Sequence, residues 1–460
     1  MVNHLSPETQ LSAEETIVAP ATADQPAGVA IVRLSGPAAL VIGARIAARA
    51  VARLSHGMMR FGSLYGPGGV LDQGYVVAFH GPRSFTGEDV VEIHCHGSPA
   101  VVRALCDAAV MWGARPAVAG EFTRRAWLAG KLDLMQAEAL LDLVSARSEA
   151  GRKQALAHLD GRASEALDTL RRPLIDALAN LEARLDFATE EDVDDLDRDA
   201  TCAALRTLGD QMSALAATAR AGLVRVRGAR VALYGAPNAG KSTLFNALLG
   251  ADRALVHDQP GTTRDVVEAE GELGDLRITW VDTAGVRDAE GAVEAAGIER
   301  ARAAAAASDV VLWLVDSSAE DADAAELPAP DGPSIVRFAT KADLSATGEG
   351  WATRWAGRPS ISALRANDVR VVRDAVTEAL NRLQGVRSQG LVLTRARQAA
   401  GLRVAAIATQ RAALALGEDA PLELPVADLR DAVDALDEVT GKIAPDDVLS
   451  AIFSRFCIGK

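Results

Sequence analysis

The sequence predicts a multidomain protein of mixed α/β and α+β class. We expect an N-terminal α+β domain, a helical domain that is discontinuous in sequence, and an α/β domain inserted into the helical one. Residues 1–125 mix short β-like runs with turns, residues 126–225 and 385–460 are helical in pattern, and residues 226–384 alternate apolar runs with polar loops. An inserted domain needs termini that lie close together, as α/β domains of this kind provide.

Short apolar runs define the N-terminal part. We expect strands at 28–36, 74–79 and 89–94, followed by a helix at 99–112. The helical pattern from 132 to about 221 contains few residues that break helices. These are Pro173, Gly151, Gly161 and Gly209. The acidic run at 190–195 is interpreted as a solvated helix end or loop, because it lacks the glycine and the ligand spacing of a calcium loop.

Residues 235–242 match G-x-x-x-x-G-K-[ST], the phosphate-binding loop. An apolar run at 229–234 precedes the motif and reads as a buried strand, and 243–249 reads as a helix closed by Gly250. Backbone N–H groups at such a helix start bind phosphates. The expected nucleotide contacts are Asn238, Ala239, Gly240, Lys241, Ser242 and Thr243, with Lys241 reaching the β- and γ-phosphates and Ser242 binding Mg²⁺.

Further nucleotide motifs follow in order. Asp282, Thr283, Ala284 and Gly285 end a strand at 276–281, where a carboxylate can hold the Mg²⁺ shell. Between the phosphate loop and that strand lie Gly261, Thr262 and Thr263, and Thr263 is the natural second hydroxyl ligand to Mg²⁺.

The chain also carries a base-recognition motif. Strands expected at 310–316 and 334–339 are followed by Thr340, Lys341 and Asp343, which resemble the N-K-x-D guanine clamp with Thr in place of Asn. Asp343 can accept two hydrogen bonds from guanine, whereas adenine leaves that carboxylate unpaired. Thr340 is shorter than Asn and has no amide, so its support of the base stays open. Ser362 and Ala363 are expected beside the base. In this order, the motifs predict a Ras-like P-loop GTPase.

Composition fits a cytoplasmic enzyme. The hydrophobic content is 49%, and no apolar run is long enough to span a membrane. The four cysteines form neither C-x-x-C pairs nor a disulfide framework, so reduced thiols are expected. The net charge of −14 argues against a protein that coats nucleic acid nonspecifically, and a local basic patch stays open. Near the C-terminus, Cys457 is an unusual residue for core filling, although a structural role stays open.

The chain resembles the MnmE (TrmE) family of tRNA modification GTPases over nearly its whole length. The C-terminal Cys-Ile-Gly-Lys is similar to the C-[IL]-G-K of that family. The other similar stretches are Arg-Leu-Ser-Gly at 33–36, Leu-Asp-Gln-Gly at 71–74, Ser-Phe-Thr-Gly-Glu-Asp at 84–89, Gly-Glu-Phe-Thr-Arg-Arg-Ala at 120–126 and Lys-Leu-Asp-Leu-Met-Gln-Ala-Glu-Ala at 131–139.

The resemblance implies that the N-terminal domain forms a homodimer and binds a tetrahydrofolate derivative, such as 5-formyl- or methylene-tetrahydrofolate. The matching folate residues are Arg33, Glu92, Lys131 and Lys460. Surface charge is the alternative for Arg33 and Lys131, and a solvent-facing position on a strand is the alternative for Glu92.

The resemblance also implies a partner and a reaction. With an MnmG-type FAD protein, in a heterotetramer, the family adds a carboxymethylaminomethyl or aminomethyl-type group to C5 of the wobble uridine of certain tRNAs. Cys457 is then a candidate catalytic residue. Much of the chemistry at uracil would come from the cofactors, and the protein would supply placement.

Hydrolysis needs a group that orients water, and Val286, which follows the D-x-x-G motif, cannot do so. The resemblance implies that Glu294 acts there as the catalytic residue, through a bridging water; a solvated glutamate at a helix start is the alternative. It also implies a bound K⁺ in place of an arginine finger, which can neutralise developing charge. Its expected ligands are Asn238 and carbonyls near His257, Gln259 and Thr262.

Two other classes of protein are weighed. A Ras-like GTPase of ribosome assembly should carry an RNA-binding module or a basic tail, and neither is visible. A folate-dependent transferase with a merely structural nucleotide domain is disfavoured by the complete Mg²⁺ and base motifs. The sequence leaves open which tRNAs are read, whether glycine or ammonium donates nitrogen, and whether Cys457 forms a covalent adduct.

Overall fold

The computed structural model describes residues 15–48, 53–146, 148–186, 197–251, 267–283, 292–318, 334–344, 359–383 and 392–459, with the backbone alone for 251 and 292–298. The chain divides into two compact units. The first comprises Met1–Leu141, Leu159–Leu167 and Asp434–Lys460, and the second comprises Asp142–His158 and Asp168–Val433.

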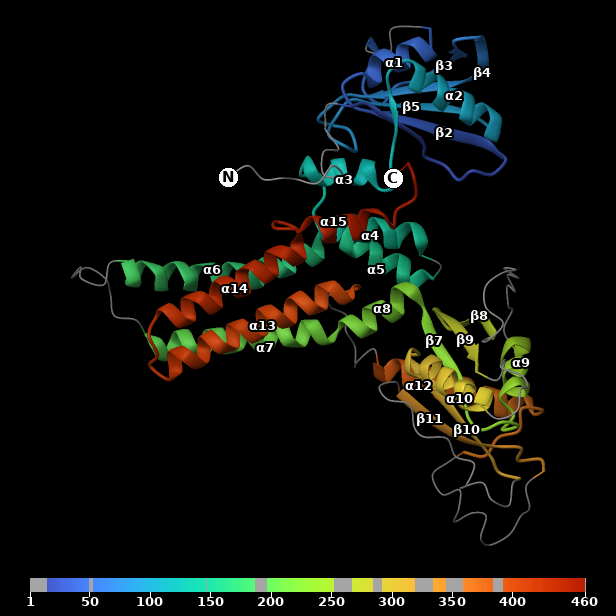
Figure 1. Cartoon of the computed structure of the whole chain (residues 1–460), viewed down its shortest axis with the longest axis vertical. Helices are drawn as coiled ribbons and strands as arrows, with labels where there is room; N and C mark the ends of the chain where they lie inside the picture. Colours follow the sequence, from blue (N-terminus) through green and yellow to red (C-terminus); the bar gives the residue numbers. More distant parts are fainter. Residues whose placement is uncertain are drawn as a thin grey trace. The chain divides into compact units, whose positions relative to one another are not determined.

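The first unit is built on a six-stranded sheet (Figure 1). Its strand order is β3 (Met59–Gly66), β4 (Gly69–Phe79), β5 (Val90–Gly97), β2 (Ala27–Ser35), β1 (Ile17–Pro20) and β6 (Arg115–Pro116). The strands pair antiparallel, except that β1 and β6 run parallel. The strand expected at 74–79 lies within β4, and those expected at 28–36 and 89–94 match β2 and β5 except for Gly36 and Asp89, which lie just outside the strands.

Alternation along the strands gives the two faces of this sheet different roles. Helices α1 (Ala39–Ile46) and α2 (Pro99–Met111) cover one face, and their core side chains pack on Val32, Leu34 and Ile93. The residues between these positions, including Arg33 and Glu92, therefore belong to the opposite face.

The C-terminal segment of the chain folds into this same unit. Helix α15 (Asp446–Phe453) packs with the start of α4 (Leu134–Ser145) in a cluster that includes Leu134, Phe453 and Phe456. Helix α3 (Glu121–Leu128) follows Gly120, whose left-handed φ of 70° and close approach to the carbonyl of Phe453 leave no room for a side chain.

The second unit contains a five-stranded sheet. Its order is β11 (Ser334–Thr340), β10 (Val310–Asp316), β7 (Ala229–Tyr234), β9 (Leu276–Asp282) and β8 (Val267–Leu273). Four strands are parallel, and the edge strand β8 is antiparallel to β9. The strands expected at 229–234, 276–281, 310–316 and 334–339 are confirmed.

Helices cover both faces of this sheet, as a parallel sheet requires. The core that includes Val231 and Leu233 of β7 also includes residues of α9 (Lys241–Ala251) and α12 (Ala366–Leu383). The alternate residues, Ala232 and Tyr234, belong to a second core with α10 (Ala292–Ala306). The phosphate loop is thus carried between buried elements, β7 and α9.

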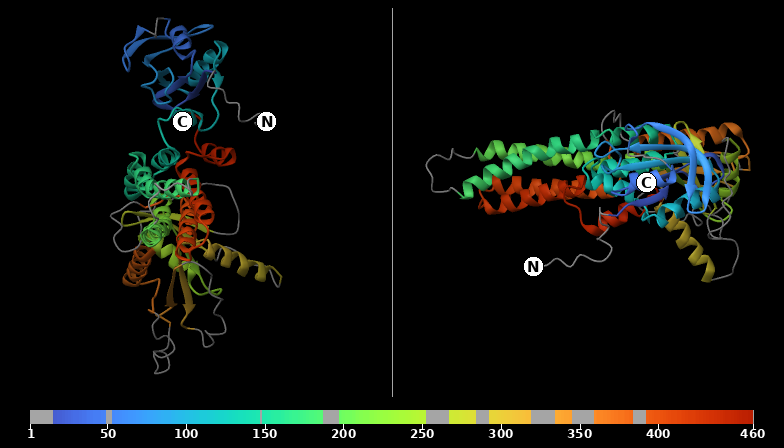
Figure 2. Two further views of the ribbon diagram at one scale, coloured as in Figure 1. Left: turned by 90° about the vertical axis from the view of Figure 1, so that its left-hand side faces the viewer. Right: turned by 90° about the horizontal axis from the view of Figure 1, so that it is seen from above.

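The remaining helices of the described ranges include four long ones, which lie side by side (Figures 1 and 2), and two shorter ones. The long ones are α6 (Arg162–Asp186), α7 (Arg198–Ala217), α13 (Ala396–Gly417) and α14 (Glu423–Thr440), and the shorter ones are α5 (Glu149–Leu159) and α8 (Ala219–Arg227). At the α7–α13 contact, a Cβ on Gly209 would lie 2.8 Å from Gln410 Cγ. Arg430 of α14 pairs with Glu182 of α6 at 2.7 Å.

Most of the expected helix breakers do not break helices. Pro173, Gly151 and Gly209 lie inside α6, α5 and α7, and only Gly161 separates two helices. Tertiary packing outweighs local propensity here, because two of these glycines admit close neighbours. Gly250 likewise does not close its helix, since α9 continues to Ala251. Within the described ranges, no helix combines the length and apolar character needed to cross a membrane.

Candidate active site

The phosphate loop joins β7 to α9, and its backbone needs glycine. Gly235 has a φ of 155°, and a Cβ there would lie 2.2 Å from the carbonyl oxygen of Leu314. Asn238 and Gly240 also have positive φ, at 65° and 82°. Only glycine fits at Gly235, where the loop passes against β10.

The loop lysine is buried. Lys241 Nζ donates to the carbonyl oxygens of Gly235 at 2.8 Å and Ala236 at 2.7 Å. Burial lowers the pKa of Lys241, and the nearby carboxylate of Asp282 opposes this shift. Ser242 and Thr243 are exposed at the start of α9. The lysine is therefore held at the loop, while Ser242 and Thr243 are accessible at the start of α9.

Asp282 and Thr283 lie beside the phosphate loop, because β9 pairs with β7 and Asp282 is level with Leu233. Both side chains are buried, and the Thr283 hydroxyl donates to the carbonyl of Leu233 at 2.7 Å. The structure thus brings the expected Mg²⁺-side carboxylate to the phosphate loop.

Several predicted residues fall outside the described residues and stay predictions. These are Ala284, Gly285, His257, Gln259, Gly261, Thr262, Thr263 and Lys460. Glu294 belongs to α10, of which the structure describes only the backbone at that position.

Thr340 connects the base-side loop to the phosphate loop. Its buried hydroxyl lies 2.8 Å from the carbonyl oxygen of Ala239 and 3.1 Å from that of Val315, donating to them. The backbone carbonyl of Thr340 in turn accepts hydrogen bonds from the N–H and hydroxyl of Ser317. Sequence reasoning missed Ser317, although its place directly after a buried strand is a usable signal.

Charged residues surround the base-side loop. Lys341 has a φ of 60°, and its Nζ pairs with Asp316 Oδ2 at 2.6 Å. Asp343 is exposed, and a hydrogen bond from the side chain of Ser362 holds the pKa of Asp343 below its usual value. Ser362 is buried, and Ala363 follows it. The residues expected to read guanine are thus together at the carboxyl ends of the parallel strands.

A second candidate site lies on the face of the six-stranded sheet opposite α1 and α2. Arg33 and Glu92 are directly opposite each other on β2 and β5, and Arg33 Nε donates to Glu92 Oε1 at 3.0 Å. The Arg33 guanidinium also lies 5.9 Å from the ring centre of Phe85 and 5.8 Å from that of Phe122. Both charged side chains are mostly buried, so neither is a simple surface charge. Lys131 is exposed, so for this residue a simple surface charge stays open as the alternative to folate binding.

The C-terminal tail reaches the same sheet. Gly459 has a φ of 101°, and a Cβ there would lie 1.9 Å from the carbonyl oxygen of Pro20 at the end of β1. The preceding residue of β1, Ala19, is level with Arg33. Cys457 is exposed with a free thiol. Gly459 therefore lies close to the strand that carries Arg33.

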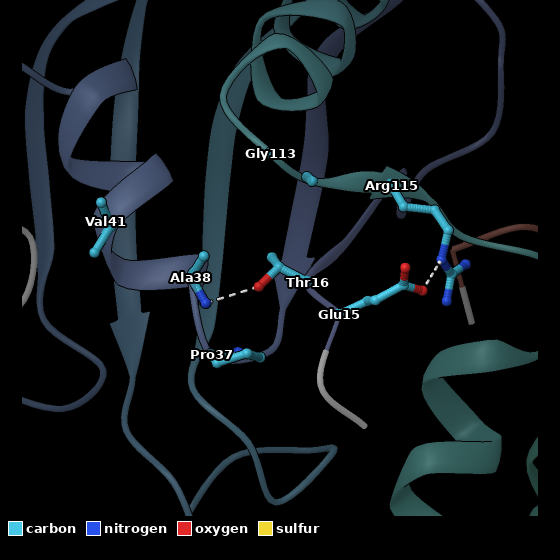
Figure 3. Close-up of a pocket in the computed structure, with 8 residues that line it drawn as sticks. Glu15, Thr16, Pro37, Ala38, Val41, Gly113 and Arg115 are labelled. Atoms are coloured by element: carbon cyan, nitrogen blue, oxygen red, sulfur yellow. Dashed lines mark hydrogen bonds and ion pairs between the residues drawn. The ribbon is translucent and has the colours of Figure 1, made fainter. Parts of the chain in front are cut away.

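A pocket of about 600 Å³ lies elsewhere on the first unit (Figure 3). Its polar side chains are already bonded: Thr16 accepts from the N–H of Ala38 at 2.7 Å, and Arg115 pairs with Glu15 at 2.8 Å. None of the predicted site residues lines it. We therefore place the candidate sites at the phosphate loop and around Arg33, rather than in this pocket.

Family models match nearly the whole chain. The model described as the GTP-binding protein TrmE N-terminus matches residues 16–131, and the model described as the MnmE helical domain matches residues 134–457.

Full-length relatives are similar throughout. The tRNA modification GTPase MnmE of Phenylobacterium zucineum is 42% identical over 454 residues, which cover 97% of this chain and 100% of the relative. The protein of the same name from Thermus thermophilus is 40% identical over 461 residues, covering 98% and 100%.

Solved structures give a weaker likeness. The FeoB G-domain of Methanococcus jannaschii is 22% identical, with a TM-score of 0.24. The match covers 33% of this chain and 97% of the FeoB chain. Era in complex with MgGDPNP and a 16S ribosomal RNA fragment is 20% identical, with a TM-score of 0.26. This match covers 40% of the present chain and 67% of the Era chain. Scores this low carry no argument about function.

Proposed function

The chain belongs to the MnmE family of tRNA modification GTPases, and from this premise we propose that it hydrolyses GTP in the course of modifying the wobble uridine of tRNA. The family match over the whole length carries the proposal. This match also disfavours a role as a GTPase of ribosome assembly. The resemblance to the MnmE family is not confined to the GTPase motifs, because the N-terminal and helical parts of the chain match the family too.

The nucleotide site fits GTP and Mg²⁺. The backbone of the phosphate loop presents N–H groups at the start of α9, which favours an anion. Ser242 is exposed there and Asp282 is buried beside the loop, so a hydroxyl and a carboxylate are available to the Mg²⁺ shell. We assign Thr263 as the second hydroxyl ligand. Lys241 would exchange its bonds to loop carbonyls for bonds to phosphate oxygens.

Thr340 gives the first test. Replacing Thr340 with Val is expected to weaken GDP binding about tenfold, because the tie to Ala239 is lost. Thr340→Asn should tighten GDP binding. The single hydroxyl proton of Thr340 is shared between the carbonyls of Ala239 and Val315, whereas the amide of Asn has two N–H groups to donate. Titration of a fluorescent GDP analogue measures both effects.

The matched control for this test is Thr377→Val, which removes an exposed hydroxyl bonded within α12 of the same domain. GTP should be preferred to ATP in the native protein, because Asp343 pairs only with guanine. A Thr340→Val protein that binds GDP like the native chain, or a native chain that binds ATP and GTP equally, contradicts the assignment.

We further propose that hydrolysis uses a bound K⁺, held by Asn238 and by carbonyls near His257, Gln259 and Thr262. Phosphate release is expected to be much faster in K⁺ than in Na⁺ at equal ionic strength, because the smaller ion does not fit the same carbonyl ligands. The rate per chain should rise with protein concentration if paired GTPase domains complete the site. Equal rates in the two salts exclude this role of the cation.

Glu294 is proposed to orient the attacking water. Glu294→Ala is expected to lower kcat by roughly 10²-fold while leaving GTP affinity nearly unchanged, because water orientation contributes only in the transition state. Single-turnover hydrolysis and nucleotide titration separate the two quantities. Glu299→Ala, on the same helix α10, is the matched control. A large loss of affinity in Glu294→Ala instead indicates a structural glutamate.

For the modification reaction, we propose that the face of the six-stranded sheet around Arg33 binds a tetrahydrofolate derivative. The mostly buried Arg33–Glu92 pair carries this proposal. A folate carries carboxylates, which Arg33, Lys131 and Lys460 can neutralise. It also carries pterin N–H groups, which can donate hydrogen bonds to the Glu92 carboxylate. When bound, the folate would supply the one-carbon unit, and the exposed thiol of Cys457 is the nearby candidate reactive group.

The proposed partners are tRNA and an MnmG-type FAD protein in a heterotetramer, in the cytoplasm, with this chain as a homodimer. Apolar side chains are exposed on the neighbouring strands β3 and β4, including Phe61 and Tyr75, whose ring centres are 5.2 Å apart. Co-purification of a tagged chain, scored for flavin absorbance and bound tRNA, tests the partners. Absence of both from the native complex overturns this part of the proposal.

A further inference from the structure

Sequence reasoning did not identify a chain of ion pairs in the first unit, at whose centre Arg125 and Glu121 are buried. Arg125 Nη1 lies 3.0 Å from Glu88 Oε2, and Arg125 Nη2 lies 3.0 Å from Glu121 Oε1. Glu121 also binds Arg115 through both of its carboxylate oxygens, at 2.7 and 2.9 Å. Glu121 is 1% exposed and Arg125 is 7% exposed. The chain runs from Glu88 through Arg125 and Glu121 to Arg115, and from there to the Glu15 pair shown in Figure 3.

The ion pairs join three segments that are distant in sequence. The Ser35 hydroxyl of β2 donates to Glu88 Oε2 at 2.6 Å and lies 2.7 Å from the hydroxyl of Thr86. Glu88 and Thr86 belong to the loop between β4 and β5, while Arg125 belongs to α3. Arg125 also donates to the backbone carbonyl of Glu15 at 2.9 Å. Glu88 therefore links β2, through Ser35, to α3, through Arg125.

The same three segments surround Arg33. Arg33 stands two residues before Ser35 on β2, so both side chains lie on the same face of the sheet. Phe85 is in the loop, and Phe122 is the residue after Glu121 in α3. The two rings lie at similar distances from the Arg33 guanidinium, 5.9 and 5.8 Å. Any shift of the loop or of α3 would thus move an aromatic ring relative to Arg33.

The energetics favour a positioning role over a purely stabilising one. Burial opposes the ionisation of Glu121, but hydrogen bonds from Arg115, from the N–H of Val118 and from Arg125 hold the pKa of Glu121 below its usual value. Buried ion pairs pay a desolvation cost that often cancels their attraction, and apolar replacements can be as stable. What the ion pairs provide is fixed geometry, because each guanidinium bonds in defined directions.

We propose that Arg125 is a positioning residue of the folate site, which holds Phe85 and Phe122 around Arg33 without touching the ligand. This inference rests on the proposed function, since it assumes that the Arg33 site binds a folate. Arg125 binds both Glu88 and Glu121 with its two terminal nitrogens, so a lysine, with one nitrogen, cannot replace it fully.

The test is a double-mutant cycle on binding of 5-formyltetrahydrofolate to the full chain, measured by calorimetry. Arg125→Met is expected to weaken binding roughly tenfold or more, by loss of charge-assisted bonds that hold the site. If Arg125 acts through Arg33, the double variant with Arg33→Lys should bind about as weakly as Arg33→Lys alone. Losses that simply add in the double variant overturn the inference, because they indicate two independent effects.

Further variants keep this test decisive. Ser35→Ala removes one hydrogen bond to Glu88, and it should weaken folate binding less than Arg125→Met does. If Arg125→Met fails to fold, the folate affinity of Ser35→Ala shows whether these contacts position the site. Arg152→Met, which breaks an exposed pair with Glu149, is the matched control and should bind folate like the native chain. A native chain that does not bind folate overturns the proposed function itself. If the native chain binds folate, and Ser35→Ala and Arg125→Met bind it with the native affinity, only the role of Arg125 is overturned.

Discussion

Deletion of residues 457–460 is expected to abolish modification of the wobble uridine in cells and to weaken folate binding, while GTP hydrolysis continues. The physical reason is placement: Gly459 packs on Pro20 of β1, which pairs with the strand that carries Arg33 of the proposed folate site. Phe453 and Phe456, which anchor the preceding segment in the core, remain in the truncated chain. Mass spectrometry of nucleosides from tRNA measures the modification.

Cys457→Ser separates the thiol from the rest of the tail. The side chain is exposed and nearly unchanged in volume, so folding and folate binding should be retained. If Cys457 takes part in the chemistry, the modification is lost in this variant too. Full modification of tRNA in the truncated strain shows that the tail has no role in the reaction, and Cys457 is then structural.

Gly235→Ala is expected to lose nearly all GTP and GDP binding. A Cβ at this position would lie 2.2 Å from the carbonyl oxygen of Leu314, and backbone on both sides leaves no flexible group to move away. The positive φ of 155° adds strain for any residue other than glycine. The phosphate loop would have to shift, and its N–H groups would lose their common direction. Titration with a fluorescent GDP analogue measures the effect.

Gly250→Ala is the matched control for this prediction. Gly250 lies in α9, and an added Cβ would meet open space within 4 Å. Alanine there should raise the free energy of unfolding by up to about 1 kcal/mol, because glycine is a poor helix former, and should leave nucleotide affinity unchanged. If Gly235→Ala binds GDP with native affinity, the loop is more adaptable than the contact with Leu314 implies.

Local patterns determined much of the nucleotide domain. The strand at Ala229–Tyr234, the phosphate loop and the helix after it follow one another directly, so a short stretch of sequence contains the whole unit. Asp282 and Thr340 were predicted from their places at strand ends, because parallel strands bring their carboxyl ends to one edge of a sheet. The signature stretches were likewise enough to indicate the family, which the full-length relatives then showed.

Other features depended on contacts between distant residues, and no local pattern encodes those. Arg33 meets Glu92 only because β2 and β5 pair in one particular register. The Thr340 hydroxyl reaches Ala239 across 101 residues, and Arg125 joins two segments that precede it by 37 and 110 residues. Pro173 and Gly209 remain inside helices because packing over many turns outweighs a local preference of about 1–3 kcal/mol. The sequence by itself thus determined the residue types and the nucleotide loop, whereas the tertiary structure decided which of those residues meet.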